Sequence, residues 1–125
     1  MTLDKELLIE GDCFSIYEII RDGKNEIRDF LQSLKAWQPS HYLKVMKRLE
    51  IVSSFGPSKR QDKFRHEGDG IYAIKVSQVR LYCFFDQGRM ILLAHGSIKK
   101  QNKARPEDLK KARDIKAAWM KSMGR

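Results

Sequence analysis

Residues 70–96 of the chain are GIYAIKVSQVRLYCFFDQGRMILLAHG, three apolar segments separated by two short polar links. The segments at 70–76, 79–85 and 89–96 are rich in the β-branched and aromatic residues that favour strands. Links of about two or three residues join antiparallel strands in tight hairpins. The stretch therefore predicts a three-stranded antiparallel meander.

Periodicity predicts the elements that precede the meander. The segment CFSIYEII (13–20) has the composition of a strand. Residues 24–37 predict a helix, because apolar side chains recur at helical spacing at Ile27, Phe30, Leu31, Leu34 and Trp37. A second helix follows Gln38-Pro39 and ends near FGPS (55–58), with a stripe of Tyr42, Met46, Leu49 and Val52. The short link predicts an antiparallel helical hairpin.

Two further segments complete the predicted fold. Residues 58–70 are polar and basic with two glycines at the end, which indicates a loop or an irregular sheet edge. Pro106, followed by two acidic residues, marks the start of a last helix, whose apolar side is Leu109, Ala112, Ile115 and Trp119. The order predicts an α+β fold in which the first strand joins the meander and the helical hairpin covers one sheet face. We find no repeat or linker, so residues 1–125 are expected to form one domain.

Composition limits the class of protein. The hydrophobic fraction is 42%, and no apolar run approaches the roughly 20 residues that cross a bilayer, so no membrane association is expected. The first residues, MTLDKELLIEGD, are acidic and lack a signal-peptide pattern. Cys13 and Cys83 are expected to be free thiols, which predicts a cytoplasmic protein. No CxxC or HxxxH spacing occurs, so we expect no metal and no cofactor.

The positive charge is concentrated near the C-terminus. The formal net charge is +9, yet residues 1–40 carry five basic and eight acidic residues. Residues 96–125 carry ten basic and three acidic residues. This asymmetry favours a polyanionic partner such as nucleic acid, or an acidic protein; a merely solvated surface is the alternative.

Arg80 is the most unusual residue of the meander. Side chains two residues apart in a strand share a face, so Arg80 shares its face with Tyr82 and Phe84. The opposite face is expected to carry Val79, Leu81, Cys83 and Phe85. A buried arginine needs a partner, and a salt bridge to Glu67 or Asp69 is one explanation. The other is a guanidinium on a concave sheet face that binds two phosphate oxygens.

Other basic residues are expected near Arg80. They leave or enter neighbouring strands of the meander at Lys99, Lys100, Lys63 and Arg65. Such a cluster can hold a phosphodiester and stabilise its pentacoordinate transition state. Further basic residues could follow a nucleic-acid backbone: Lys103, Arg105, Lys110, Lys111 and Lys116. His66 and His95 are candidates for proton transfer, because imidazole titrates near neutrality, or else are structural.

Residues 70–112 resemble the phage-derived, HigB-like branch of the RelE/ParE toxin superfamily. That branch has a GLYELR strand, a YRVFYFF strand and an LLHGFxKKTxKTP segment before its C-terminal helix. The resemblance extends over about residues 14–120 and implies a RelE-like fold. It places the site residues of the branch on Arg80, Lys99, Lys100, Lys103, Lys63 and Arg65.

The chain departs from this branch at several positions. Ser97, Gln101 and Lys75 replace phenylalanine, threonine and arginine. RelE-type sites often contain a C-terminal tyrosine, and no tyrosine follows Tyr82 here. The resemblance therefore assigns no general base.

The resemblance implies the toxin of a type II toxin–antitoxin system. Such a protein is a metal-independent endoribonuclease that cleaves mRNA on the ribosome, so the implied partners are a cognate antitoxin, the ribosome and mRNA. One alternative is a ParE-like, non-enzymatic inhibitor of a protein such as gyrase. Another is a nucleic-acid-binding relative without activity.

Overall fold

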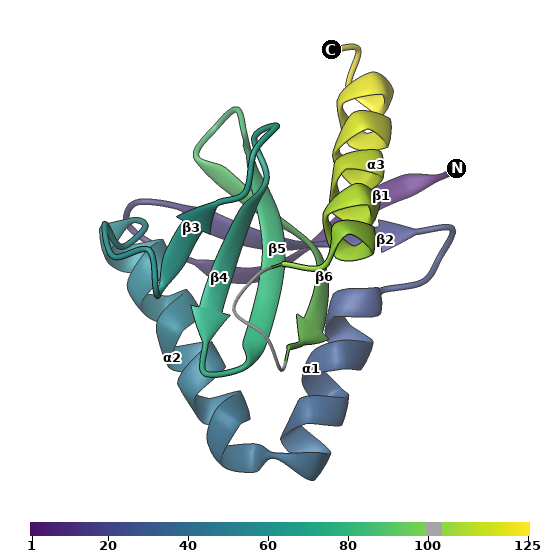
Figure 1. The fold of residues 1–125 in the computed structure, drawn as a ribbon. Coiled ribbons are helices and arrows are strands. Elements are labelled where there is room, and N and C mark those ends of the chain that lie inside the picture. Colours follow the sequence, from purple (N-terminus) through teal and green to yellow (C-terminus); the bar gives the residue numbers. More distant parts are fainter. Residues whose placement is uncertain (100–103) are drawn as a thin grey trace.

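A six-stranded mixed sheet separates two layers of helix in the computed structural model, which describes residues 1–99 and 104–125 (Figure 1). The α+β class is confirmed. The strands are β1 (Leu3–Glu10), β2 (Ser15–Arg21), β3 (Phe64–His66), β4 (Tyr72–Val76), β5 (Val79–Asp86) and β6 (Met90–Ile98). The helices are α1 (Glu26–Trp37), α2 (Pro39–Phe55) and α3 (Pro106–Ser122).

The predicted meander forms the middle of the sheet. The strand order is β1-β2-β6-β5-β4-β3, and β4, β5 and β6 are antiparallel neighbours. The strand predicted over residues 13–20 corresponds to β2, which joins the meander as a parallel neighbour of β6. The edge strand β1, which pairs with β2, was not predicted. The short β3 forms the other edge within the basic stretch 58–70, where a loop or an irregular sheet edge was expected.

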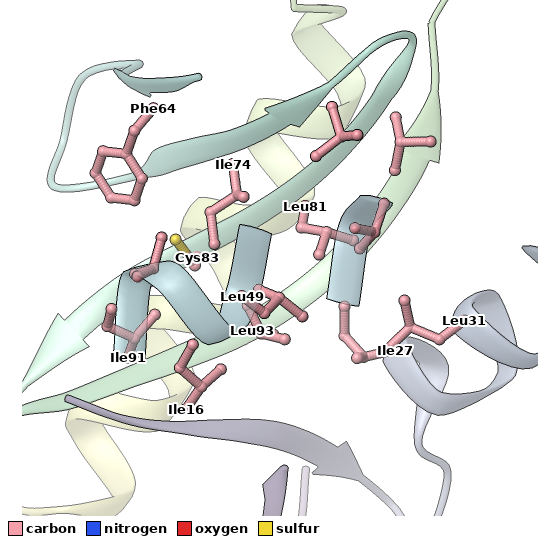
Figure 2. Packing of buried hydrophobic residues seen from close by; sticks show 14 of the residues in the cluster. Ile16, Ile27, Leu31, Leu49, Phe64, Ile74, Leu81, Cys83, Ile91 and Leu93 are labelled. Carbon is pink, nitrogen blue, oxygen red and sulfur yellow. The ribbon is translucent and has the colours of Figure 1, made fainter. Parts of the chain in front are cut away.

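One sheet face is covered by α1 and α2. Their buried apolar side chains, among them Ile27, Leu31 and Leu49, meet those of the meander (Figure 2). The predicted face of β5 is confirmed, because Leu81 and Cys83 lie in this cluster. The fit is close: a methyl group on Gly96 would lie 2.7 Å from a ring carbon of Phe30.

The two helices on this face do not form the predicted hairpin. They diverge from Gln38 as the arms of a V, with α1 against β6 and α2 nearer β4 (Figure 1). Trp37 was predicted to lie on the core stripe of α1, and this is wrong: its relative exposure is 84%. Trp37 is the last residue of its helix, at the point of the V where the two helices meet, so its side chain projects beyond the core.

The opposite sheet face is covered by α3. Three of the four predicted apolar residues of this helix, Ala112, Ile115 and Trp119, are buried, and Leu109 is partly buried against the same cluster. The helix packs on Tyr82, Phe84 and neighbouring apolar residues of the sheet. Trp119 also donates a hydrogen bond of 2.8 Å from Nε1 to Asp86, which fixes the far end of the helix.

A β-bulge in β6 determines which side chains of its last residues meet α3. Tyr82 pairs with His95 and Cys83 pairs with Leu93, so Ala94 is an extra residue. As a result, Ala94 and His95 both contact residues of the α3 face. The alternation of faces is shifted from this point on, and Ser97 also faces α3, donating a hydrogen bond to Asp108 at 3.1 Å.

Candidate anion-binding site

The candidate site lies on the α3 face of the sheet, at the end beside the β4–β5 turn. Lys75 of β4 pairs with Arg80 of β5, and Arg80 pairs with Ser97 of β6. These positions form a row across three strands. Lys99 lies two residues beyond Ser97, and its backbone NH donates to the Gln78 carbonyl at 2.7 Å, which holds it beside the turn.

A narrow depression brings three cations together. It is lined by Lys75, Arg80 and Lys99, with Glu67, Ala73, Tyr82 and Ala104 completing the wall. We call this depression the cationic pocket. Three basic side chains face one carboxylate, and that carboxylate, Glu67, pairs with Arg65 at 3.2 Å. The pocket therefore has an excess of positive charge.

Arg80 is buried without an ion-pair partner among residues 1–99 and 104–125. Its Nη1 atom donates to the carbonyls of Ser77 at 2.6 Å and Val79 at 3.0 Å. Neither acidic residue considered from the sequence pairs with it, since Glu67 contacts Arg65 and Asp69 contacts Arg113. Carbonyl contacts fix the guanidinium but leave its charge uncompensated, and burial lowers its pKa.

The two lysines of the pocket lie in the same unfavourable field. Burial, followed by the charge of Arg80, lowers the pKa of Lys75. The same two causes, in the same order, lower the pKa of Lys99. The charge of Arg80 therefore makes both lysines harder to charge, and an anion entering the pocket would relieve this repulsion.

Tyr82 is a pocket residue that the sequence reasoning missed as a candidate. Its ring is fully buried and lies 5.0 Å from the ring of His95, measured between centroids. In the described part of the chain, its hydroxyl is the only buried side-chain polar atom without a hydrogen-bond partner. Burial raises the pKa of Tyr82, despite the opposing influence of the nearby Ser97 hydroxyl. The only signal in the sequence was its position two residues after Arg80.

The two candidate histidines lie outside the cationic pocket. His95 is buried behind Tyr82, and its Nε2 donates to the Asp108 carbonyl at 2.9 Å. Burial lowers the pKa of His95, so the neutral ring is the favoured form. The ring of His66 lies 4.8 Å from that of Tyr72, between centroids, in a tilted arrangement. Tyr72 packs against the apolar cluster under α1 and α2, on the sheet face opposite Arg80.

The structure places the other predicted basic residues in several locations. Lys63 and Arg65 border the pocket without lining it, although the Lys63 carbonyl accepts from the Lys75 backbone NH at 2.9 Å. Arg105 pairs with Asp108 at 3.1 Å. Lys100 and Lys103 lie outside the described residues.

The lysines of α3 do not form one free basic face. Lys110 pairs with Asp114 on the same helix at 2.8 Å, and Lys111 pairs with Glu26 of α1 at 2.6 Å. Lys116 donates to the carbonyl of Asp69 at 2.8 Å. These contacts point to different sides of the helix, so the three lysines are separated from one another.

Potential metal ligands are scattered in the described part of the chain. Within 1–99 and 104–125, no three His, Cys, Asp or Glu side chains are grouped so that they could hold a metal ion. Both cysteines are free, with Cys83 buried and Cys13 partly buried. Burial raises the pKa of the Cys83 thiol, so it is a packing residue. None of the described helices has the length and apolar character needed to cross a membrane.

The comparison with protein families matches residues 32–117 to the family described as phage derived protein Gp49-like (DUF891). The chain belongs to this phage-derived, Gp49-like family. The matched range of this Gp49-like protein includes α2, the whole meander and most of α3, and so contains every residue of the cationic pocket. A comparison with curated proteins gave no match.

Proposed function

We propose that this Gp49-like protein is the toxin of a type II toxin–antitoxin system, of the HigB-like kind, and that it cleaves mRNA on the ribosome in the cytoplasm. The observation that carries the proposal is the cationic pocket, in which Lys75, Arg80 and Lys99 converge with one carboxylate that is already paired. Membership of a phage-derived, toxin-like family supports it.

The chemistry that suits this pocket is cleavage by the RNA itself. The 2′-hydroxyl attacks the adjacent phosphorus and loses its proton, while the bond from phosphorus to the 5′ oxygen breaks and that oxygen takes up a proton. The products carry a 2′,3′-cyclic phosphate and a 5′-hydroxyl. Negative charge builds up on the phosphoryl oxygens during this step, and fixed cations stabilise it.

Each pocket residue has a separate role in the proposed reaction. Arg80, fixed by its two carbonyl contacts, orients the phosphate with its planar fork. Lys75 and Lys99 neutralise the developing charge. The positions of His66 and His95 give neither histidine a contact with this phosphate, so orientation and charge stabilisation carry the proposal.

Cleavage of mRNA on translating ribosomes, with purified components, tests this function. We expect Arg80→Ala and Lys99→Ala to reduce the rate about 100- to 1000-fold each, as loss of one preorganised charge-stabilising group typically does. Lys44→Ala is a matched control, because Lys44 is exposed on α2, on the opposite side of the sheet. A folded Arg80→Ala protein that cleaves at the wild-type rate would contradict the proposal.

An antitoxin is the partner that this function requires. We propose that its acidic or amphipathic segment covers the cationic pocket, because opposite charge speeds and orients association. Co-expression with the protein encoded next to this gene should restore growth that the toxin alone arrests. A complex that leaves Arg80 and Lys99 open to solvent would contradict the proposed mode of inhibition.

One observation favours the second candidate, a non-enzymatic inhibitor of a protein such as gyrase. An apolar groove of about 220 Å³ lies between the end of α1 and β6, bordered by the exposed Trp37 and Ile98. If this groove carried the activity, Trp37→Ala would abolish growth arrest and Arg80→Ala would retain it. If the protein is an endoribonuclease, Arg80→Ala would abolish growth arrest and Trp37→Ala would retain it.

A further inference from the structure

Tyr82 lines the cationic pocket, and its hydroxyl group makes no hydrogen bond within the described part of the fold. Tyr82 is fully buried, and its hydroxyl has no hydrogen-bond partner among residues 1–99 and 104–125. The Ser97 hydroxyl lies close enough to influence the pKa of Tyr82, but it directs its own hydrogen to Asp108, at 3.1 Å. A buried polar group without a partner destabilises the folded state, and phenylalanine would fill the same space without this cost.

The side chains around this hydroxyl indicate what it could bind. Lys75, Arg80 and Lys99 line the same depression, and all three are donors without an acceptor function. None of them can accept the hydrogen of a neutral phenol. An anionic ligand would supply the missing acceptor, and three cations favour such a ligand.

The single carboxylate of the pocket does not exclude an anion. Glu67 lines the wall, but its carboxylate accepts from Arg65 Nε at 3.2 Å. The cations therefore outnumber the carboxylate even before Arg65 is counted. The depression is too narrow for a water molecule as it stands, and the flexible lysine side chains must turn outward to admit a ligand.

We propose that Tyr82 is a phosphate-contacting residue, whose hydroxyl donates a hydrogen bond to a phosphoryl oxygen held between Lys75, Arg80 and Lys99. The ligand class is a phosphate group, as a free ion or within an RNA backbone. Binding of a phosphate within an RNA backbone rests on the proposed function. Because burial raises the pKa of the phenol, Tyr82 acts as a neutral donor and not as a general base.

The test compares Tyr82→Phe with the wild-type protein, using inorganic phosphate as the probe. Phosphate binding, followed by NMR titration of the backbone amides, should weaken about 10- to 100-fold, the value of one hydrogen bond to a charged group. The melting temperature without phosphate should stay the same or rise, because the unpartnered hydroxyl is gone. Tyr72→Phe, on the opposite sheet face, is the matched control and should leave binding unchanged.

Two readouts separate this inference from the proposed function. If wild-type protein binds phosphate in a Tyr82-dependent manner but cleaves no mRNA, the inference stands and the endoribonuclease is wrong. If wild-type protein cleaves mRNA, and Tyr82→Phe binds phosphate and cleaves as wild type does, the inference is overturned and the function stands. Absence of any phosphate binding by the wild-type protein also overturns it.

Discussion

The two faces of the sheet differ in how completely helices cover them. On one face, α1 and α2 cover apolar side chains from β2 across to β3. On the other, α3 covers Tyr82, Phe84 and their apolar neighbours but stops short of Lys75, Arg80 and Lys99. The covered face is built for stability. The partly covered face gives up some stability, because like charges repel, and gains a binding pocket.

The largest expected effect lies on the fully covered face. Leu49→Ala removes a completely buried side chain from the centre of the α1/α2 layer. It should lower the free energy of unfolding by about 2 to 5 kcal/mol, through lost burial and the cavity left behind. Urea denaturation measures this loss. A loss below about 1 kcal/mol would mean that this face relaxes easily and that the contrast between the faces is weaker than the structure indicates.

The second prediction concerns the covered half of the α3 face. Trp119→Phe keeps most of the packing but removes the hydrogen bond to Asp86. We expect a loss of about 1 to 3 kcal/mol in the free energy of unfolding, because a buried acceptor loses a partner. Trp37→Phe is the natural control, since Trp37 is exposed, and its effect should stay within about 0.5 kcal/mol. Equal losses for the two variants would show that α3 is not held by Trp119.

The third prediction concerns the cationic pocket, which α3 leaves uncovered. Substitutions there should not lower the free energy of unfolding. Lys75→Met and Lys99→Met each remove one of three mutually repelling charges while keeping an unbranched side chain. Each should leave the free energy of unfolding unchanged or raise it by up to about 1 kcal/mol, and should impair phosphate binding. The gain should shrink at high salt, which screens repulsion. A clear loss of stability in both variants would show that the lysines hold the fold together.

The smallest effect is expected from His95, which lies between the sheet and α3. Because burial lowers its pKa below the ordinary value of 6.5, the unfolded chain binds the proton more readily than the folded protein. The free energy of unfolding should therefore be highest above pH 6.5 and fall as the pH drops toward the lowered pKa. His95→Gln should show a shallower pH dependence. An unchanged slope would assign the titration to other groups.

Much of the covered face could be predicted from the sequence. The meander, two helices and the face of Leu81 and Cys83 follow from alternation and helical periodicity, which report directly on burial. Trp37 was misplaced because periodicity does not show where a helix runs past the sheet. The edge strand β1 was missed, and β3 was anticipated only as a possible irregular sheet edge, because their side chains are partly polar and edge strands need only one apolar face.

The uncovered end was predictable only in part. Arg80 and Lys99 could be placed together, because neighbouring strands and the resemblance to a known branch both put them at one edge. Lys75 and Tyr82 could not be recognised as site residues, because their roles depend on the cross-strand register and on which groups lack partners. The separation of His66 from Arg80 could not be predicted either, because no pattern in the sequence fixed the register of β3.

The extra residue in β6 also sets a rule of parity for this protein. Because Ala94 stands outside the regular pairing with β5, Lys99, and not Ile98, lies on the side of Arg80. If Ala94 took a regular place in the pairing, every later position of the strand would exchange sides, sending a lysine toward α1 and an isoleucine into the pocket. The pairing at Ala94 therefore constrains this site as strongly as the identity of its charged side chains. A change of pairing that leaves every pocket residue in the sequence can still remove the pocket from the protein.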